Sequence, residues 1–303
     1  MLMKRYICLG AGIFNYDIVA LKEGKTSRTI IEEVGGTCGN VMCILSQMGW
    51  RAYPIARLDE SEYGLRLKDD LQSFGCDTSY VTNAADGGTT LLNVVHRKYA
   101  DGGHKVSVRA SGPQGGRFPN YRFIRIDRAR EILEAMDFAP DVFFFDSPNA
   151  GHRVLAEELR KKGTLVYFEP GNLKEPGVGK CIALSDIVKF SQEAIPDVSF
   201  TEEYDGKLFI QTMGGDGIRF RLGCSEWVHL PAVQSDGVVD WEGAGDWTTS
   251  AFINALMKAD ALSAVAMTMD IVSEALKEAQ SVAVRSISFM GSKGMIRESK
   301  TNF

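Results

Sequence analysis

Short apolar runs of strand length alternate with helix-length segments along most of this 303-residue chain. Residues 142–145 read Val-Phe-Phe-Phe, a run without a polar position, which is typical of a strand buried on both faces. Residues 154–162 then show helical spacing and end at Gly163. Because strand, helix and next strand join most simply as a parallel unit, the alternation predicts an α/β fold with a mostly parallel sheet covered by helices on both faces.

The alternation of predicted strands and helices continues along the chain, with two interruptions. Further strands are predicted at 6–9, 51–56, 165–168, 187–190 and 208–212, and further helices at 41–48, at 62–74 and along the apolar stripe of Val265, Met269, Val272, Leu276 and Ala279. In 16–34 and 89–108, β-branched residues alternate with polar ones and no helical stripe fits. These stretches predict a small separate sheet, either a lid over a site or an edge hairpin, within one domain that spans 1–303.

Composition narrows the class of protein. The chain carries 34 basic and 39 acidic side chains, a formal charge of −5, which argues against a polyanionic partner such as nucleic acid, despite an arginine-rich segment at 115–130. No apolar run approaches the ~20 residues that cross a bilayer, and no signal peptide is evident. The six cysteines show no zinc-ligand spacing, and the four histidines are dispersed. Reduced thiols predict a cytoplasmic location.

One glycine-rich sequence near the C-terminus has chemical meaning. Residues 243–246 read Gly-Ala-Gly-Asp and precede a segment with helical spacing. Small residues let the backbone approach an anion, and a helix start directs unpaired N–H groups toward it, so this sequence predicts an oxyanion or phosphate cradle. Asp246 beside the cradle could accept a proton from an attacking hydroxyl. The structural alternative is an ordinary N-cap, in which the Asp246 side chain binds free amides.

Two further clusters suit a ligand site. Residues 35–40 read Gly-Gly-Thr-Cys-Gly-Asn before a predicted helix, and Asn15 and Asp17 follow the first strand, so they can lie at the carboxyl edge of the sheet. The amide and carboxylate groups of these side chains can form hydrogen bonds with the hydroxyls of a polyol. Residues 212–217 read Thr-Met-Gly-Gly-Asp-Gly after another strand. They predict a ligand-sized turn or, alternatively, a plain hairpin.

Taken together and in this order, these motifs resemble those of the ribokinase (PfkB-type) family of sugar kinases. The similarity spans nearly the whole chain, and Gly243 to Asp246 is its most specific part. The resemblance implies a three-layer αβα core with a mostly parallel sheet and a small β-sheet lid. It also implies ATP and Mg²⁺, phosphoryl transfer to a sugar hydroxyl, and a possible monovalent cation such as K⁺.

The resemblance assigns roles residue by residue. Asp246 is implied as the base, and the amides of Gly243, Ala244 and Gly245 as the anion hole. The sugar hydroxyls would be held by Asn15, Asp17, Gly35, Gly36 and Asn40. The nucleotide would be bordered by Thr212, Gly214, Gly217 and, in a loop at 290–294, Gly291.

The chain also departs from the family pattern. Asp240-Trp241-Glu242 stands where the family has Asp-Thr, with Asp240 implied at the monovalent cation, and Thr248 replaces an aromatic residue. The family's Asn-x-x-Glu motif, linked to the metal, reads Ser-Gln-Glu-Ala at 191–194, so only Glu193 offers a carboxylate. Because Mg²⁺ is held largely by phosphates and waters, the change need not abolish transfer.

The interpretation that follows is an ATP-dependent carbohydrate kinase acting on ribose, fructose or a related sugar or sugar acid. One alternative is a catalytically silent sugar-binding regulator on a kinase scaffold. Another is a nicotinamide-dependent oxidoreductase, from Gly10-Ala11-Gly12 after the first strand with an acidic residue about 20 positions on. That fingerprint lacks its third glycine and its helix. A homodimer through the exposed lid strands is also expected.

Overall fold

The computed structural model describes residues 5–98, 104–112, 120–235 and 237–301. Two expectations fall partly outside these ranges: residues 99–103 of the second interruption and 115–119 of the arginine-rich segment.

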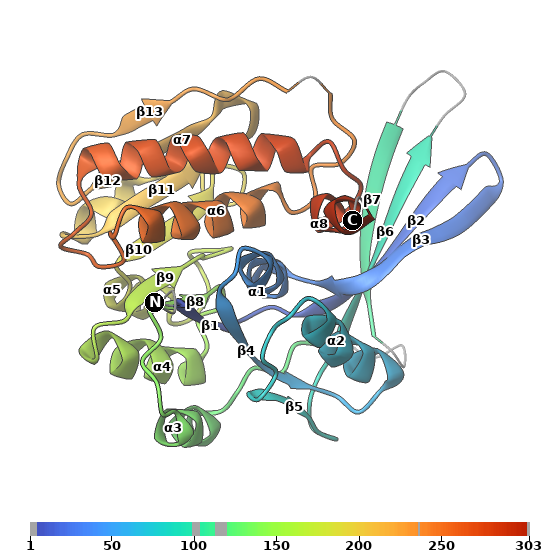
Figure 1. Ribbon diagram of the computed structural model, residues 1–303, viewed down its shortest axis with the longest axis horizontal. Helices are drawn as coiled ribbons and strands as arrows, with labels where there is room; N and C mark the ends of the chain where they lie inside the picture. Colours follow the sequence, from blue (N-terminus) through green and yellow to red (C-terminus); the bar gives the residue numbers. More distant parts are fainter. Residues whose placement is uncertain (1–4, 99–103, 113–119, 236, 302–303) are drawn as a thin grey trace.

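A nine-stranded sheet forms the centre of the described part of the molecule (Figure 1). Its strands, in spatial order, are β13 (Val228–Leu230), β12 (Ile218–Leu222), β11 (Leu208–Thr212), β10 (Ile187–Ser191), β9 (Leu165–Phe168), β8 (Val142–Phe145), β1 (Ile7–Ala11), β4 (Arg51–Leu58) and β5 (Val81–Asn83). From β5 to β11 all neighbours are parallel, and β12 and β13 add antiparallel pairs at one edge. The carboxyl ends of the parallel strands therefore meet along one edge of the sheet.

The central strands β8 and β9 are apolar at every position, so both faces of the sheet must be shielded from water. Helices cover each face. Side chains of Val142 and Phe144 join one core, and Phe143 and Phe145 join the other. The first core is closed by α1 (Thr37–Gln47), α2 (Glu62–Ser73), α6 (Ala244–Lys258) and α7 (Met269–Ser286). The second is closed by α3 (Ile126–Ala135), α4 (Ala150–Lys161) and α5 (Val178–Leu184). Single 3-10 turns lie at Ser199–Glu203 and Gly214–Asp216, and α8 (Gly294–Thr301) ends the described chain.

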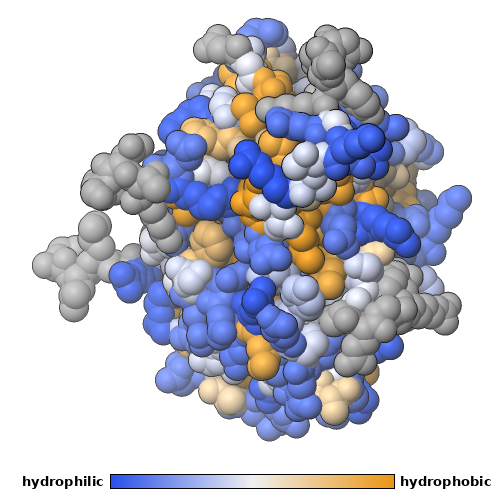
Figure 2. Space-filling view, turned by 90° about the vertical axis from the view of Figure 1, so that its right-hand side faces the viewer, coloured by the Kyte–Doolittle hydropathy of each residue, from blue (hydrophilic) through white to orange (hydrophobic). Residues whose placement is uncertain are grey.

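A second, four-stranded sheet projects from one side of the molecule (Figure 1). Its order is β3 (Thr26–Gly35), β2 (Asn15–Glu23), β6 (Thr90–Lys98) and β7 (His104–Ser111). Viewed from this side, apolar residues form a band between hydrophilic ones (Figure 2). The predicted α/β core with a small separate sheet is thus confirmed, while pairing of two copies through this sheet stays a prediction.

The expected elements are largely in place, but three helices begin elsewhere than predicted, one of them α1, which begins at Thr37 and not at residue 41. Val265 was predicted to lie on the last apolar stripe, but α7 begins at Met269 and Val265 is 95% exposed. The Thr268 side chain accepts a hydrogen bond from the Ile271 amide, which caps the helix after Val265. The helix predicted from residue 154 begins four positions earlier, where Asn149 caps it in the same manner.

Two findings bear on cellular context. None of the helices in the described part of the chain combines the length and apolar character needed to traverse a bilayer. All six cysteines are free thiols, and Cys224 is the exposed one.

Candidate active site

The sugar-site motif and the glycine-rich cradle meet through one hydrogen bond. Nδ2 of Asn40, in the first turn of α1, donates to Oδ2 of Asp246, in the first turn of α6, at 2.7 Å. Asp246 as a residue is half-buried. The N-cap of α6 is Gly243, and no side chain caps this helix start. The alternative interpretation of Asp246 as an ordinary N-cap is therefore wrong.

The cradle has the backbone shape expected of an anion site. Gly243 has φ 79°, a left-handed conformation that favours glycine, and a Cβ there would lie 2.5 Å from Cβ of Ser292. Ala244 and Gly245 follow in the first turn of α6, where backbone N–H groups have no partner within the helix; the Ala244 amide donates instead to the Trp241 carbonyl at 3.1 Å. Such amides, together with the positive end of the helix dipole, suit a phosphoryl group.

The predicted sugar-binding residues lie together at the base of the small sheet. Asn15 pairs with Gly35 across β2 and β3, and the Asn15 Nδ2 donates to Oδ1 of Asp17. A Cβ on Gly35 would lie 1.9 Å from Oδ2 of Asp17, and one on Gly36 2.8 Å from Oδ1 of Asn15. Both glycines therefore make room for this polar pair, whose free lone pairs suit sugar hydroxyls.

A buried carboxylate that sequence reasoning missed holds this region in place. Asp146, directly after β8, accepts hydrogen bonds from the Ile13 amide at 2.9 Å and the Cys38 amide at 3.0 Å. It thereby joins the segment after β1 to the start of α1. A lone Asp after an apolar run carries no sequence signal for these two distant amides.

A cavity of about 460 Å³ opens beside the cradle. The residues that line it include Thr212, Gly214, Gly217, Trp241, Ala244, Gly245, Thr248 and Ala283. Three of the four predicted nucleotide residues therefore share one cavity with the cradle. The turn after β11 joins two antiparallel strands, so the hairpin alternative describes its local shape as well. The cavity is mostly apolar and of a size that suits a small-molecule ligand.

Gly291, the fourth predicted nucleotide residue, lies elsewhere. Its amide donates to Oδ2 of Asp240 at 2.9 Å, and a Cβ on it would lie 2.8 Å from Ile31 in β3. It thus packs between the cradle segment and the small sheet, outside the group of residues that line the cavity. Oδ1 of Asp240 accepts from the Glu242 amide at 3.1 Å, so both carboxylate oxygens already bind backbone N–H groups.

A buried ion pair, also missed from the sequence, faces the cradle. Nζ of Lys189 in β10 lies 2.8 Å from Oε2 of Glu169, which follows β9. The same Nζ would be 3.9 Å from a Cβ on Gly245. Oε1 of Glu169 accepts a hydrogen bond from the Thr249 hydroxyl in α6. An ammonium group therefore lies beside Gly245 of the cradle.

The predicted metal carboxylate does not join this cluster. Glu193 is exposed, in the turn after β10. Over the residues that the structure describes, no group of three or more His, Cys, Asp and Glu side chains is placed to hold a metal ion.

Burial sets the charge of three carboxyls at this edge of the sheet. Desolvation raises the pKa of Asp246, Asp17 and Asp146 from 3.8 to about 7 each. At Asp246, the Asn40 hydrogen bond lowers the pKa and nearby Glu169 raises it. A carboxyl with a pKa near neutrality can take a proton from a hydroxyl and release it again, as a general base must.

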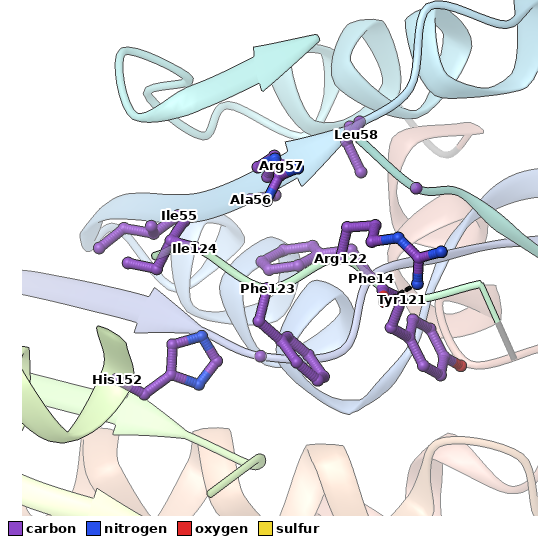
Figure 3. Close-up of a pocket in the computed structure, with 12 residues that line it drawn as sticks. Phe14, Ile55, Ala56, Arg57, Leu58, Tyr121, Arg122, Phe123, Ile124 and His152 are labelled. Atoms are coloured by element: carbon purple, nitrogen blue, oxygen red, sulfur yellow. Dashed lines mark hydrogen bonds between the residues drawn. The ribbon is translucent and has the colours of Figure 1, made fainter. Parts of the chain in front are cut away.

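A second, much smaller hollow lies beside the sugar site (Figure 3). Side chains from β4 and from residues 121–124 close around about 20 Å³, which is room for a single water molecule. The side chains of Phe123 and His152 meet edge to face there, and desolvation lowers the pKa of His152 to about 4. The side chains around this hollow pack beside Tyr121. The Tyr121 hydroxyl donates to Oδ1 of Asn15 at 3.5 Å.

Comparison with known proteins identifies the architecture. The ribokinase of Arabidopsis thaliana, solved with ribose and ATP, is 18% identical and superposes with a TM-score of 0.69 over 96% of this chain and 95% of the other. The fructokinase of Xylella fastidiosa, solved with ATP, is 18% identical, with a TM-score of 0.71 over 96% and 94%. This chain has the ribokinase fold.

Sequence comparison agrees with the ribokinase fold. An ATP-dependent ribose-1-phosphate kinase of Halopiger xanaduensis is 23% identical over 259 residues, which are 81% of this chain and 83% of that protein. No protein-family model matches the chain. The resemblance expected from the motifs is thus confirmed for the fold, and the roles of individual residues stay predictions.

The ribokinase fold explains which site residues had a sequence signal. Residues in glycine-rich motifs at element boundaries were found because glycine marks special backbone geometry. Glu169, Lys189 and Asp146 were missed because each is a single charged residue whose partners are distant in the chain.

Proposed function

We propose that this protein is an ATP-dependent carbohydrate kinase. The observation that supports the proposal is the Asn40–Asp246 hydrogen bond at the cradle, because it joins an amide proposed to bind the sugar to a carboxyl proposed as the base. The cavity on the other side of the cradle supplies the volume for a nucleotide. The named relatives, a ribose-1-phosphate kinase, a ribokinase and a fructokinase, act on ligands of this chemistry.

In the proposed reaction, Asp17, Gly36 and Asn40 hold sugar hydroxyls, with Asn15 and Gly35 beside them. A hydroxyl oxygen attacks the γ-phosphorus of ATP, the bond to the β–γ bridging oxygen breaks, and ADP leaves. The hydroxyl proton passes to Asp246. The amides of Gly243, Ala244 and Gly245 stabilise the charge that spreads over the transferred oxygens.

Lys189 has a place in the same proposal. Its ammonium lies between Glu169 and the cradle, on the strand that leads into the altered family motif at 191–194. We propose that the Lys189 ammonium binds the oxygens of the transferred phosphoryl group. A cation already fixed in a water-poor site stabilises the negative charge on these oxygens without reorganising. Glu169 keeps the buried ammonium paired when no nucleotide is bound.

Mg²⁺ would neutralise the charge of the β- and γ-phosphates. The described residues offer no cluster of three metal ligands. Phosphate oxygens and waters would therefore supply most of the ligands of the ion. Glu193 stays the predicted outer carboxylate. Asp240 stays the predicted monovalent-cation residue, although its two oxygens already accept backbone N–H groups.

The four-stranded sheet would act as the lid. His96 in β6 lies 3.6 Å from Oδ2 of Asp240, and both side chains are buried, so the sheet contacts the segment that leads into the cradle. A lid that excludes water protects the phosphoryl group from hydrolysis.

The test is release of ADP, measured with a panel that includes ribose, fructose, ribose 1-phosphate and a sugar acid, with phosphorus-31 NMR to identify the phosphorylated product. Sugar-dependent ADP release supports the proposal, and its absence across the panel contradicts it.

A second candidate is a sugar-binding regulator without turnover. The observation that favours it is the exposed Glu193 in an altered metal motif. Such a protein would bind a sugar in calorimetry and release no ADP. The oxidoreductase alternative has no support, because the strand β1 is followed by strand β2 and not by the helix that a dinucleotide fingerprint requires.

A further inference from the structure

Lys293 is a buried cation that the proposed reaction does not use. Its side chain is 0% exposed, in the loop before α8. Removing an ammonium group from water costs several kcal/mol unless hydrogen bonds and an opposite charge compensate. A lysine in this position therefore needs partners, and its partners show what it does.

Two of the partners belong to the candidate site. Nζ of Lys293 donates to Oδ1 of Asn40 at 2.6 Å and to Oγ of Ser292 at 2.9 Å. The Ser292 hydroxyl in turn donates to the same Asn40 oxygen at 3.0 Å. Oε1 of Glu33 lies 3.4 Å from the ammonium, and Glu33 shares its charge between Lys293 and Arg297.

These donors determine which way the Asn40 amide faces. Because two donors meet Oδ1, the amide nitrogen must point the other way, where it donates to Oδ2 of Asp246 at 2.7 Å. The reverse orientation would set an amide oxygen against the carboxylate and an amide nitrogen against the ammonium, and both contacts would be repulsive.

We propose that Lys293 is a positioning residue for phosphoryl transfer, which acts through Asn40 to orient and keep ionised the Asp246 carboxylate. The inference rests on the proposed kinase function and adds a residue to it. Lys293 touches neither substrate, since its whole side chain is covered.

The charge of Lys293 matters as well as its hydrogen bond. The charged groups that act on Asp246 are Glu169 after β9, Lys189 in β10 and Lys293 before α8. Of these, Glu169 raises the pKa of Asp246, and the two lysines lower it. Loss of Lys293 removes one of the two opposing cations, so the pKa of Asp246 should rise. The base would then be protonated over more of the neutral pH range.

The test is a double-mutant cycle of Lys293→Met, Asn40→Ala and the double variant, read as kcat/KM against pH. Lys293→Met should lower kcat/KM about 10-fold or more, the scale for a misplaced catalytic group. Its acid limb should move to higher pH. In the Asn40→Ala background, Lys293→Met should lower kcat/KM much less than alone, because the hydrogen-bonded route to Asp246 is already removed, while the displacement of the acid limb by the lost charge should remain.

Lys293→Gln separates the two contributions. It keeps a donor for Asn40 without the charge, so it should recover part of kcat/KM while the acid limb stays displaced.

A matched control is Lys207→Met. Lys207 is also buried, 7% exposed, and bonds the Ala183 and Ser185 carbonyls at 2.9 and 2.7 Å, at the opposite end of β11 from the cavity. The Lys207→Met variant should have a lower free energy of unfolding than the wild type and the same dependence of kcat/KM on pH.

A readout without turnover is the titration of the Asp246 carboxyl by carbon-13 NMR, assigned with Asp246→Asn. A higher pKa in Lys293→Met than in the wild type supports the inference. An unchanged titration and acid limb, or additive effects of the Lys293 and Asn40 variants, would overturn it. Absence of turnover in the wild type would instead contradict the kinase proposal, and the titration would still decide whether Lys293 acts on Asp246.

Discussion

The Asn40 amide and the Asp246 carboxylate, 206 residues apart in the chain, are joined by a hydrogen bond of 2.7 Å. Asn40 lies in the first turn of α1 and Asp246 in the first turn of α6, and both helices pack on the same face of the sheet. The bond therefore links the sugar-side motif to the cradle across the carboxyl edge of the strands. Predictions about the proposed reaction follow from this geometry.

Asp246→Asn should lower turnover by at least ~100-fold, the scale of general-base catalysis, because the amide accepts no proton. Sugar affinity should be largely retained, since the hydroxyl ligands remain. The measurement is ADP release at saturating sugar and ATP. Asp127→Asn, an exposed carboxylate in the first turn of α3, is the matched control and should keep turnover. Undiminished turnover in Asp246→Asn would refute the base assignment.

Asp17→Ala should weaken sugar binding by more than ~1 kcal/mol, roughly a fivefold rise in Kd, because it removes a hydroxyl acceptor and leaves the Asn15 amide unpaired. Calorimetry with the sugar found in the panel measures this change. ATP binding should be unaffected, since Asp17 does not line the nucleotide cavity. An unchanged sugar Kd would contradict the sugar-site proposal.

The pH dependence of kcat/KM should show an acid limb near pH 7. Desolvation raises the pKa of Asp246 to about 7, and a general base acts only when deprotonated, so the rate should rise as pH rises through this value. A limb near pH 4 instead would contradict the assignment of Asp246 as the titrating base, because kcat/KM reports the pKa values of the free enzyme.

Stability should change in the opposite direction. The folded state holds the Asp246 proton up to about pH 7, whereas the unfolded chain releases it near 3.8, so the free energy of unfolding falls as pH rises through this window. Asp246→Asn removes this contribution. Urea unfolding should therefore show the variant gaining stability relative to the wild type at about pH 8 compared with about pH 5. An equal difference at both pH values would contradict the elevated pKa.

The Lys189–Glu169 pair should be required for turnover rather than for folding. Replacing one partner would leave an unpaired buried charge, so the informative variant is the double change Lys189→Met with Glu169→Gln. It should fold and lose ~100-fold or more in kcat, the scale for one lost donor to a developing oxyanion. Circular dichroism checks the fold. A folded double variant with wild-type kcat would remove Lys189 from the phosphoryl site.

Ala283→Phe should obstruct nucleotide binding, because Ala283 in α7 lines the 460 Å³ cavity. Filling that space should raise the Kd of ATP by about 10-fold or more, the lower range for overpacking. The measurement is ATP titration followed by tryptophan fluorescence, since Trp241 lines the same cavity and is 66% exposed. Sugar binding should remain as in the wild type, and an unchanged ATP Kd would move the nucleotide elsewhere.

Local patterns were enough to predict the elements of the fold. A strand such as β8 is apolar at all four positions because helices cover both faces of the sheet, and that pattern is readable in one chain. The glycines at 36 and 243 were also readable, because their left-handed backbone excludes most other residues. The beginning of α7 was misjudged because Val265 fits the helical spacing but precedes the N-cap at Thr268.

By itself, then, the sequence determined the alternation of strands and helices, the extra small sheet and the glycine turns at the site, since these depend on neighbours along the chain. Only the tertiary structure decided that Lys293 lies against Asn40, Lys189 against Glu169 and Asp146 against two distant amides. The physical reason is that a buried charge takes its partners from whichever elements the sheet brings beside it. Those partners lie tens to hundreds of residues away, where no periodicity can point to them.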